Sequence, residues 1–219
     1  MARVKAAVLI SGRGSNMQAL IDAAADPGYP AEIVRVISNA PGAGGLERAA
    51  AAGIATAAID HRDFDGRAPF EDALHAELTA AGVELVCLAG FMRLLTAEFV
   101  ERWSDRMINI HPSLLPSYKG LHTHERVLED GVRFTGCTVH FVRPAMDAGP
   151  IIVQAAVPVL PGDDADTLAA RVLTAEHRCY PHALGLVAAG RTSIVDETVI
   201  IEDAAGPAGI TLNPDDGGS

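Results

Sequence analysis

The first half of the chain alternates short apolar runs with stretches of helical periodicity. Residues 4–10 form an apolar run that ends at a glycine-rich turn, and a helical pattern follows directly. Residues 85–90 are continuously apolar, as is typical of a central parallel strand that is covered on both faces. The pattern of this half predicts strands at 4–10, 32–38, 56–59 and 85–90, and helices at 17–25, 45–52, 69–81 and 96–103.

The second half brings several strands close together in the sequence. A long helix is predicted at 166–189, and Pro181 is expected to kink or interrupt it. The remaining elements are predicted strands at 107–111, 137–142 and 151–157, a helix at 122–129 and a small hairpin at 194–201. This succession predicts an α/β fold: a single, Rossmann-like, doubly wound domain whose mostly parallel sheet has an antiparallel part near the C-terminal half.

The predicted domain covers residues 1–202. The N-terminal half is expected to bind a phosphate group, and the C-terminal half to carry the chemistry. Glycine, proline and acidic residues dominate from residue 203 to residue 219, so this acidic tail is predicted to be mobile.

Composition narrows the possible partners. The net charge is −11, which argues against non-specific binding to nucleic acid or to a membrane surface. Three widely separated cysteines show no metal-type spacing, and the N-terminus lacks the pattern of a secretory signal. We expect a cytoplasmic protein with reduced thiols, small-molecule partners and a monomeric or homodimeric state.

Candidate chemistry begins at residues 107–111. Side chains two residues apart on a strand point to the same side, so Asn109 and His111 should project together. Pro112 has no backbone N–H and ends the strand. An amide and an imidazole are therefore presented at the carboxyl end of a strand, where open α/β sheets bind ligands. A pair of structural polar residues would produce the same pattern.

The glycine-rich turn after the first strand favours a phosphate group. Gly12 and Gly14 lack the third glycine of the dinucleotide fingerprint, and no Walker lysine follows. A helix N-terminus with free N–H groups remains, and Ser15 and Asn16 can cap that helix or contact an anion. A tight turn with a simple helix cap explains the residues about equally well.

Asp147 is the best candidate for a third catalytic group. It lies in a turn between two predicted strands, and pairing with His111 would orient the imidazole and favour its charged form. A cationic histidine beside a neutral amide could then stabilise an oxyanion. No serine or cysteine has the setting of a nucleophile. A metal site is disfavoured: His122 and His124 fit a helix start or pocket wall, and His140 fits a packed strand position.

Five segments carry a resemblance to a known family. They read SGRGSN at 11–16, LAGFMRLL at 88–95, NIHPSLLP at 109–116, GLHTH at 120–124 and MDAGPII at 146–152. In identity, order and spacing they resemble the folate-dependent phosphoribosylglycinamide formyltransferases, over residues 4–200. One departure is Arg143-Pro144, where the family pattern leads us to expect a more polar or acidic turn.

The resemblance implies a formyltransferase fold and a specific reaction. A formyl group would pass from 10-formyltetrahydrofolate, as co-substrate, to the amine of glycinamide ribonucleotide in purine synthesis. No metal is expected, and the amine would attack directly, without an acyl-enzyme. Asn109 and His111 would bind the tetrahedral oxyanion, and Asp147 would orient His111 or a water molecule.

The resemblance also implies the binding residues. The ribonucleotide would contact Gly14, Ser15, Asn16, Ser113 and Glu176. Without the resemblance, Glu176 reads as an exposed helix residue and Ser113 as a turn residue. The folate would contact a larger group of residues, largely through backbone atoms: Arg67, Met92, Arg93, Leu94, Leu95, Asn109, Arg143, Pro144, Ala145, Met146 and Asp147.

Other enzymes and a non-enzyme share this core. Methionyl-tRNA formyltransferases are longer and carry a basic C-terminal module, whereas this chain is acidic. Formyltetrahydrofolate deformylases hydrolyse the donor, and they typically have a second histidine where Pro112 stands. A non-catalytic binding module of the same fold is the third alternative, and the intact Asn109, His111 and Asp147 argue against it.

Overall fold

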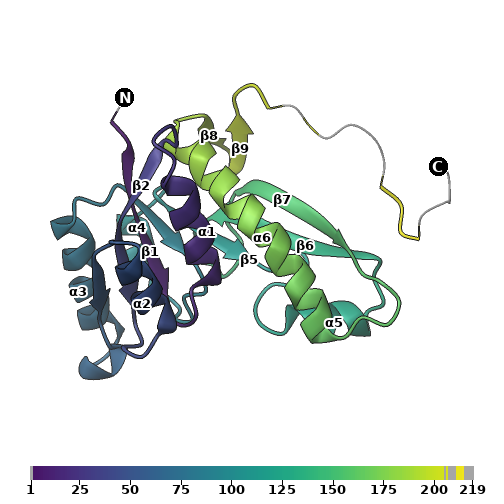
Figure 1. Cartoon of the computed structure of the whole chain (residues 1–219), viewed down its shortest axis with the longest axis horizontal. Coiled ribbons are helices and arrows are strands. Elements are labelled where there is room, and N and C mark those ends of the chain that lie inside the picture. Colours follow the sequence, from purple (N-terminus) through teal and green to yellow (C-terminus); the bar gives the residue numbers. More distant parts are fainter. Residues whose placement is uncertain (1, 205, 207–210, 215–219) are drawn as a thin grey trace.

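A computed structural model describes residues 2–204, 206 and 211–214 of the chain (Figure 1). Its main feature is a seven-stranded sheet in the order β3-β2-β1-β4-β5-β6-β7. Neighbouring strands from β3 to β5 run parallel, and β6 and β7 are added antiparallel. The strands are β1 Val4–Ile10, β2 Ala31–Ser38, β3 Thr56–Ala58, β4 Leu85–Leu88, β5 Met107–His111, β6 Phe134–Phe141 and β7 Ile151–Pro158.

Helices cover both faces of the sheet, because the central strands β1 and β4 are apolar on both sides. One face packs against α1 (Ser15–Ala24), α2 (Gly44–Ala51), α5 (Thr123–Glu129) and α6 (Ala165–Ala188). The other packs against α3 (Arg67–Ala80) and α4 (Ala97–Arg102). Within β1, alternate residues such as Val8 and Leu9 enter the two different clusters. This arrangement confirms the predicted doubly wound, mostly parallel fold with its antiparallel part.

Most predicted elements are present, with boundaries shifted by up to three residues. The terminal hairpin is formed by β8 (Thr192–Val195) and β9 (Thr198–Ile201), and a short 3-10 helix spans His61–Asp63. The largest shift is at β6, which begins at Phe134 instead of residue 137. Paired strands extend each other through backbone hydrogen bonds, which side-chain alternation does not reveal.

Pro181 was expected to kink or interrupt the last long helix; it does not interrupt the helix, and the kink stays a prediction. Helix α6 continues through this residue to Ala188. The residues around the proline explain why: Tyr180, Ala183 and Leu184 are fully buried against the sheet. Burying that apolar face outweighs the one backbone hydrogen bond that a proline removes.

Two further expectations concern the cysteines and the tail. Cys87 and Cys137 are buried in strands as predicted, and Cys179 is buried in α6. Residues 205, 207–210 and 215–219 of the predicted tail lie outside the described residues. No helix among the described residues is long and apolar enough to cross a membrane.

Tyr180 of α6 connects the central strands β4 and β5. Its buried hydroxyl donates to the carbonyl of Leu88 at the end of β4, at 2.9 Å, and lies 3.2 Å from the carbonyl of Ile108 in β5. Leu88 pairs with Asn109, and Ile108 precedes Asn109 in β5. One side chain of α6 therefore supports the spacing of β4 and β5 beside Asn109.

Tyr180→Phe should therefore lower the free energy of unfolding by about 1–2 kcal/mol, because two buried carbonyls lose a donor. Denaturant titration measures the change. Tyr118→Phe is the matched control: its hydroxyl bonds the exposed Asp130, so the loss should stay below about 0.5 kcal/mol. Equal losses in the two variants would contradict the role given to Tyr180.

Candidate active site

Asn109 and His111 lie side by side at the end of β5, as the alternation predicts. Their neighbours Ile108 and Ile110 enter the core on the opposite side of the strand. Strand β5 pairs in parallel with β4 and antiparallel with β6, so it marks the change of direction in the sheet. The chain turns at Ser113, whose N–H donates to the carbonyl of His111. The two polar side chains thus occupy a switch point, where open sheets form ligand-binding crevices.

His111 is held by contacts to both ring nitrogens. Its Nε2 donates to the carbonyl of Tyr118 at 2.9 Å. Its Nδ1 lies 3.5 Å from Oδ2 of Asp147. The imidazole is 8% exposed and the carboxylate 11%, so the pair is shielded from solvent. The predicted pairing of Asp147 with His111 is therefore present in the structure.

The loop between β6 and β7 presents Asp147. Asp147 has a positive φ of 50°, and its Oδ2 accepts a hydrogen bond from the backbone N–H of Gly120 at 2.9 Å. Gly149, two residues on, packs so tightly that a Cβ would overlap the carbonyl oxygen of Phe141. The absence of a side chain at Gly149 lets the loop return closely to the sheet and hold Asp147 over the strand end.

His140 is the site residue whose role the sequence did not reveal. It pairs with Asn109 across β5 and β6, and it is 3% exposed. Its Nδ1 donates to the carbonyl of Phe141, so Nε2 of the neutral ring can accept from Nδ2 of Asn109 at 3.3 Å. Burial lowers the pKa of His140 and favours that neutral form. His140 is packed and hydrogen-bonded as predicted, and it also orients the amide of Asn109.

The glycine-rich loop forms a small cleft at the ends of β1 and β4. A cleft of about 150 Å³ is lined by Gly12, Arg13, Gly14, Ser15, Asn16, Ala89 and Gly90. Gly14 has a φ of 71°, and a Cβ there would come within 3.0 Å of Cα of Gly45 in α2. The turn thus leaves the first N–H groups of α1 facing the cleft, as expected for an anion site.

Asn16 and Glu176 join the start of α1 to α6. Nδ2 of Asn16 donates to Oε2 of Glu176 at 2.7 Å. Glu176 is 6% exposed, so the alternative reading as an exposed helix residue is wrong. Burial raises the pKa of its carboxyl, while Oδ1 of Asn16 is buried with no hydrogen-bond partner. One buried polar atom beside the glycine loop, Oδ1 of Asn16, is therefore left unsatisfied by the protein itself.

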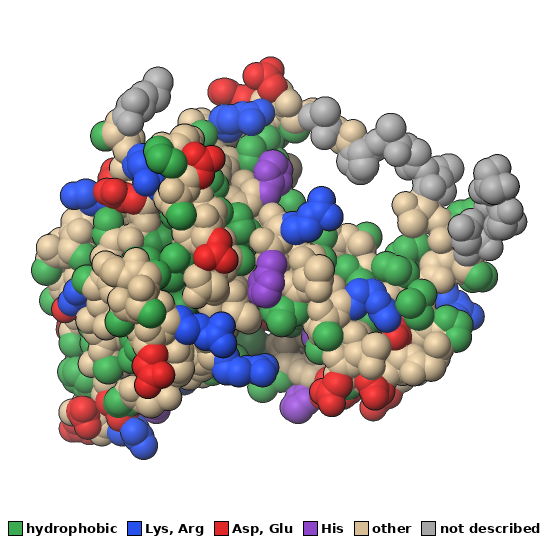
Figure 2. All heavy atoms as spheres, viewed as in Figure 1, with side chains coloured by type: hydrophobic (Ala, Val, Ile, Leu, Met, Phe, Trp, Pro, Cys, Tyr) green, Lys and Arg blue, Asp and Glu red, His purple; other side chains and the backbone are tan. Residues whose placement is uncertain are grey.

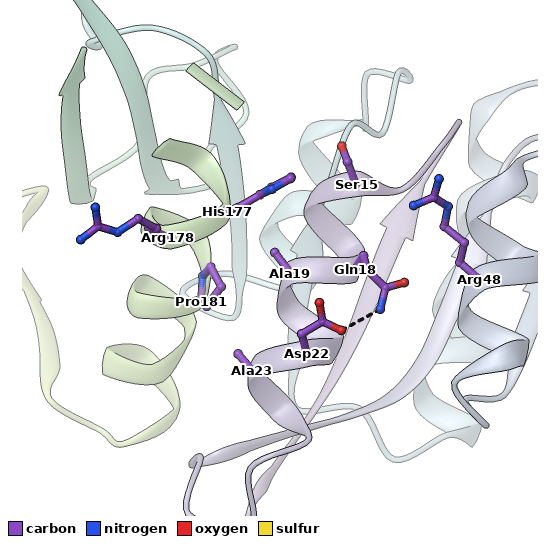
Figure 3. Close-up of a pocket in the computed structure, with 9 residues that line it drawn as sticks. All are labelled: Ser15, Gln18, Ala19, Asp22, Ala23, Arg48, His177, Arg178 and Pro181. Atoms are coloured by element: carbon purple, nitrogen blue, oxygen red, sulfur yellow. Dashed lines mark hydrogen bonds between the residues drawn. The ribbon is translucent and has the colours of Figure 1, made fainter. Parts of the chain in front are cut away.

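A larger open cleft of about 630 Å³ continues from Ser15 along the groove between α1 and α6 (Figure 3). His177 of α6 points toward α1, and Nε2 of its ring is buried with no partner. Arg48 reaches the cleft from α2, and no ion pair involves it among the described residues. Figure 2 shows basic side chains gathered around a hollow on this face. Locally the cleft suits an anion, although the chain as a whole is acidic.

The loop after β4 borders the glycine loop. The N–H of Met92 donates to the hydroxyl of Ser11 at 2.8 Å, which ties the two loops together. Met92 and Leu94 are exposed apolar residues, and Leu95 packs on the second core cluster. Arg93 turns away, with its guanidinium 5.3 Å from the ring centroid of Phe70. This loop thus offers backbone groups and apolar side chains to a ligand.

Three predicted binding residues differ in the contacts of their side chains. Arg67 is an exposed residue at the start of α3. Ser113 is fully buried, and its hydroxyl donates to the carbonyl of Ser117 at 2.7 Å. Arg143 forms ion pairs with Asp105 and Glu197, each at 2.8 Å. Ligand contacts by these three residues stay predictions.

The thiols and hydroxyls of the site region are poorly placed for nucleophilic catalysis. Burial raises the pKa of the Cys87 thiol to about 12. Cys137 and Cys179 are also buried, and the hydroxyl of Ser113 is engaged. Among the described residues, no group of three or more acidic, cysteine or histidine side chains could hold a metal ion. His122 occupies the N-cap position of α5, a helix start as predicted, without a side-chain capping bond, and His124 is half-buried in the first turn.

The match to a family model agrees with this geometry. Residues 4–184 match the model described as formyl transferase. The chain therefore belongs to the formyl transferase family.

A relative of similar length narrows the class of formyl transferase. The phosphoribosylglycinamide formyltransferase of Escherichia coli (strain K12) is 48% identical over 184 residues, which are 84% of this chain and 87% of that protein.

A solved structure supports the same grouping. Glycinamide ribonucleotide transformylase 1 from Symbiobacterium toebii has a TM-score of 0.89 at 46% identity, covering 92% of this chain and 95% of that one. Within the family, the chain groups with the phosphoribosylglycinamide formyltransferases.

Two further matches differ in length or in identity. The trifunctional purine biosynthetic protein adenosine-3 of Gallus gallus is 54% identical over 192 residues, or 88% of this chain. The chain spans only 19% of that protein's length. A formyltetrahydrofolate deformylase from Burkholderia mallei has a TM-score of 0.83 at only 28% identity, covering 91% of this chain and 70% of that one.

The buried carboxyl of Glu176 predicts a pH-dependent effect on stability. Burial raises its pKa above the unfolded value, so the folded protein favours the protonated form. The contribution of Glu176 to stability should fall as pH rises from about 4 toward the raised pKa. Glu176→Gln has no charge to bury and keeps an acceptor for Asn16, so the variant should be more stable at about pH 8 and equal to wild type near about pH 4.

Thermal unfolding of both proteins across this pH range measures the difference. Glu129→Gln, at an exposed position of α5, controls for the loss of one acidic charge. A Glu176→Gln variant that is less stable than wild type at high pH would contradict the sign of the shift.

Proposed function

We propose that this protein transfers a formyl group from 10-formyltetrahydrofolate to the amine of N1-(5-phospho-D-ribosyl)glycinamide, a step of purine synthesis. The observation that carries the proposal is the position of Asn109, His111 and Asp147. They meet at the switch point of the sheet, between the loops that follow β1 and β4 on one side and the loop that follows β6 on the other. Two different ligands can approach one strand end from these two sides.

The reaction proceeds by direct attack of the substrate amine on the formyl carbon. A C–N bond forms, and the carbonyl oxygen becomes an oxyanion that an N–H of Asn109 and the adjacent imidazole of His111 stabilise. The tetrahedral intermediate then breaks its bond to N10 of the folate. One proton leaves the attacking amine and one reaches N10, so the formyl group moves without a covalent enzyme intermediate.

Asp147 and His140 set the geometry of this step. The carboxylate of Asp147 faces Nδ1 of His111 at 3.5 Å and stabilises positive charge on the imidazole as the oxyanion develops. His140 accepts from Asn109 and so limits the directions that the amide can take. Such preorganised donors need little rearrangement during the reaction.

The ribonucleotide binds at the glycine loop. Its phosphate contacts the N–H groups and side chains of Gly14, Ser15 and Asn16 at the start of α1. Glu176 accepts from hydroxyl or amine groups of the ribonucleotide, and Ser113 contributes from the turn after β5. Unsatisfied polar atoms around Asn16 support this assignment, because a bound polar ligand can pair with them.

The folate binds between the loop that follows β4 and the loop that follows β6. The loop formed by Met92, Arg93, Leu94 and Leu95 provides one wall. The second wall is the loop Arg143, Pro144, Ala145, Met146 and Asp147, whose Met146 is exposed. Arg67 offers a positive charge for the acidic tail of the folate. Residues 1–202 form the catalytic domain, and we propose cytoplasmic activity in a monomer or homodimer.

Hydrolysis of the formyl donor is the main alternative, since a deformylase shares this fold. Pro112 next to His111 and the much higher identity to the transferases favour transfer to an amine. The decisive assay mixes protein, formyl folate and glycinamide ribonucleotide and follows loss of the donor. Amine-dependent turnover is expected. Formate release at the same rate without the amine would establish the hydrolase instead.

Asp147→Asn should reduce turnover by about 10²-fold or more, because a neutral amide no longer stabilises charge on His111. The substitution is nearly isosteric, and asparagine tolerates a positive φ, so the melting temperature should change little. Steady-state kinetics and thermal unfolding measure the two effects. Retention of near-normal turnover would remove Asp147 from the mechanism.

Asn16→Ala should raise the KM for the ribonucleotide about tenfold or more, with a smaller effect on the KM for the folate, because a polar contact at the phosphate turn is lost. Thr174→Ala in α6 is the control, since the exposed Thr174 hydroxyl bonds only the carbonyl of Ala170 and the residue lines neither cleft. If both variants keep the wild-type KM for the ribonucleotide, the phosphate assignment fails.

A further inference from the structure

Arg143 links three loops that are far apart in the sequence. Its guanidinium donates to Glu197 through Nε at 2.8 Å and Nη2 at 3.2 Å, and Nη2 also bonds Asp105 at 2.8 Å. Glu197 lies in the turn between β8 and β9, and Asp105 lies two residues before β5. The Arg143 side chain is 18% exposed, so the planar guanidinium is largely enclosed between its partners.

The two ends of the Asp147 loop are held differently. At the C-terminal end, Gly149 packs on Phe141, and the N–H of Phe141 donates to the carbonyl of Pro150. At the N-terminal end, the N–H of Val142 donates to the carbonyl of Met107, and the next residue is Arg143. Residues 144–146 are exposed, so they add little burial to hold the loop. Arg143 therefore anchors the loop where sheet pairing ends.

Both carboxylates lie on residues with a constrained backbone. Asp105 and Glu197 have a φ of 57° each, in tight turns that direct their side chains. The Arg143 hydrogen bonds hold the pKa of the Glu197 carboxyl below its usual range, so it stays ionised at neutral pH. This geometry connects the start of β5, which leads to Asn109 and His111, with the loop that carries Asp147.

We propose that the bridge formed by Arg143, Asp105 and Glu197 is a positioning device for catalysis, and that the β8–β9 hairpin acts through it on the active site. The proposal rests on the transfer reaction proposed above. It assigns Arg143 a task for its side chain, while its backbone remains available to the folate. A displacement of about 1 Å at a reacting group can cost about 10²-fold in rate, so a loop anchor of this kind can control turnover.

The test removes the partners of Arg143 and leaves the arginine in place. Asp105→Asn/Glu197→Gln should lower kcat about three- to tenfold and raise the KM for the formyl folate, because the Asp147 loop samples unproductive positions. The KM for the ribonucleotide should not change, since the glycine loop lies on the other side of the strand end. A general loss of stability would not produce this selective pattern.

Asp196→Asn is the matched control. It removes one acidic charge from the same turn, at a residue that also has a positive φ and has no ion pair among the described residues. Its kinetic constants should equal those of wild type. If the double variant folds poorly, Glu197→Gln alone should show a smaller effect in the same direction.

Hydrogen exchange provides a readout that does not depend on the reaction. Backbone amides of residues 145–149 should exchange about three- to tenfold faster in the double variant, and at the wild-type rate in Asp196→Asn. Kinetic constants equal to those of the control would overturn the proposal. If wild type itself transfers no formyl group, the proposed function fails, and the exchange rates alone then decide whether the bridge orders the loop.

Discussion

The enclosure of His111 between a backbone carbonyl and a carboxylate is the contact on which the proposed chemistry depends. Tyr118 accepts from Nε2, and Asp147 faces Nδ1, in a region nearly closed to solvent. Each contact requires a separate part of the fold: the turn after β5 and the loop after β6. The change from parallel to antiparallel pairing at β5 brings those two parts together, so sheet topology determines which groups surround the imidazole.

The site also retains polar groups that a purely structural protein would pair. Glu176 is buried beside a single amide donor, Oδ1 of Asn16 has no partner, and Nε2 of His177 is buried and unpaired. Leaving a buried polar atom unsatisfied typically costs about 1–3 kcal/mol. The three residues lie along the glycine loop and its adjoining cleft, where a ribonucleotide would supply partners for the unpaired atoms of Asn16 and His177. The unpaired atoms therefore lower the stability of the free protein and are available to bind a ligand.

Much of this arrangement could be predicted from the sequence, for physical reasons that differ by residue. Asn109 and His111 share a face because strand alternation is a local property. The anion-binding turn at Gly14 was also predictable, although local residues alone did not separate it from a simple helix cap. Pairing across strands was not predictable in this way, so the contact between His140 and Asn109 went unrecognised. The family resemblance pointed to Glu176 as a binding residue. The burial of Glu176 could not be predicted, because it depends on how α6 packs against α1.

Direct transfer without a covalent intermediate is the central claim, since the three cysteines are buried and the hydroxyl of Ser113 is already hydrogen-bonded. The most direct measurement is a single turnover with donor labelled in the formyl carbon, quenched at short times, with protein and nucleotide separated. The account predicts that the label passes to the ribonucleotide amine as fast as the donor is consumed, with no labelled protein at any time. Labelled protein that forms first and then decays into product would contradict it.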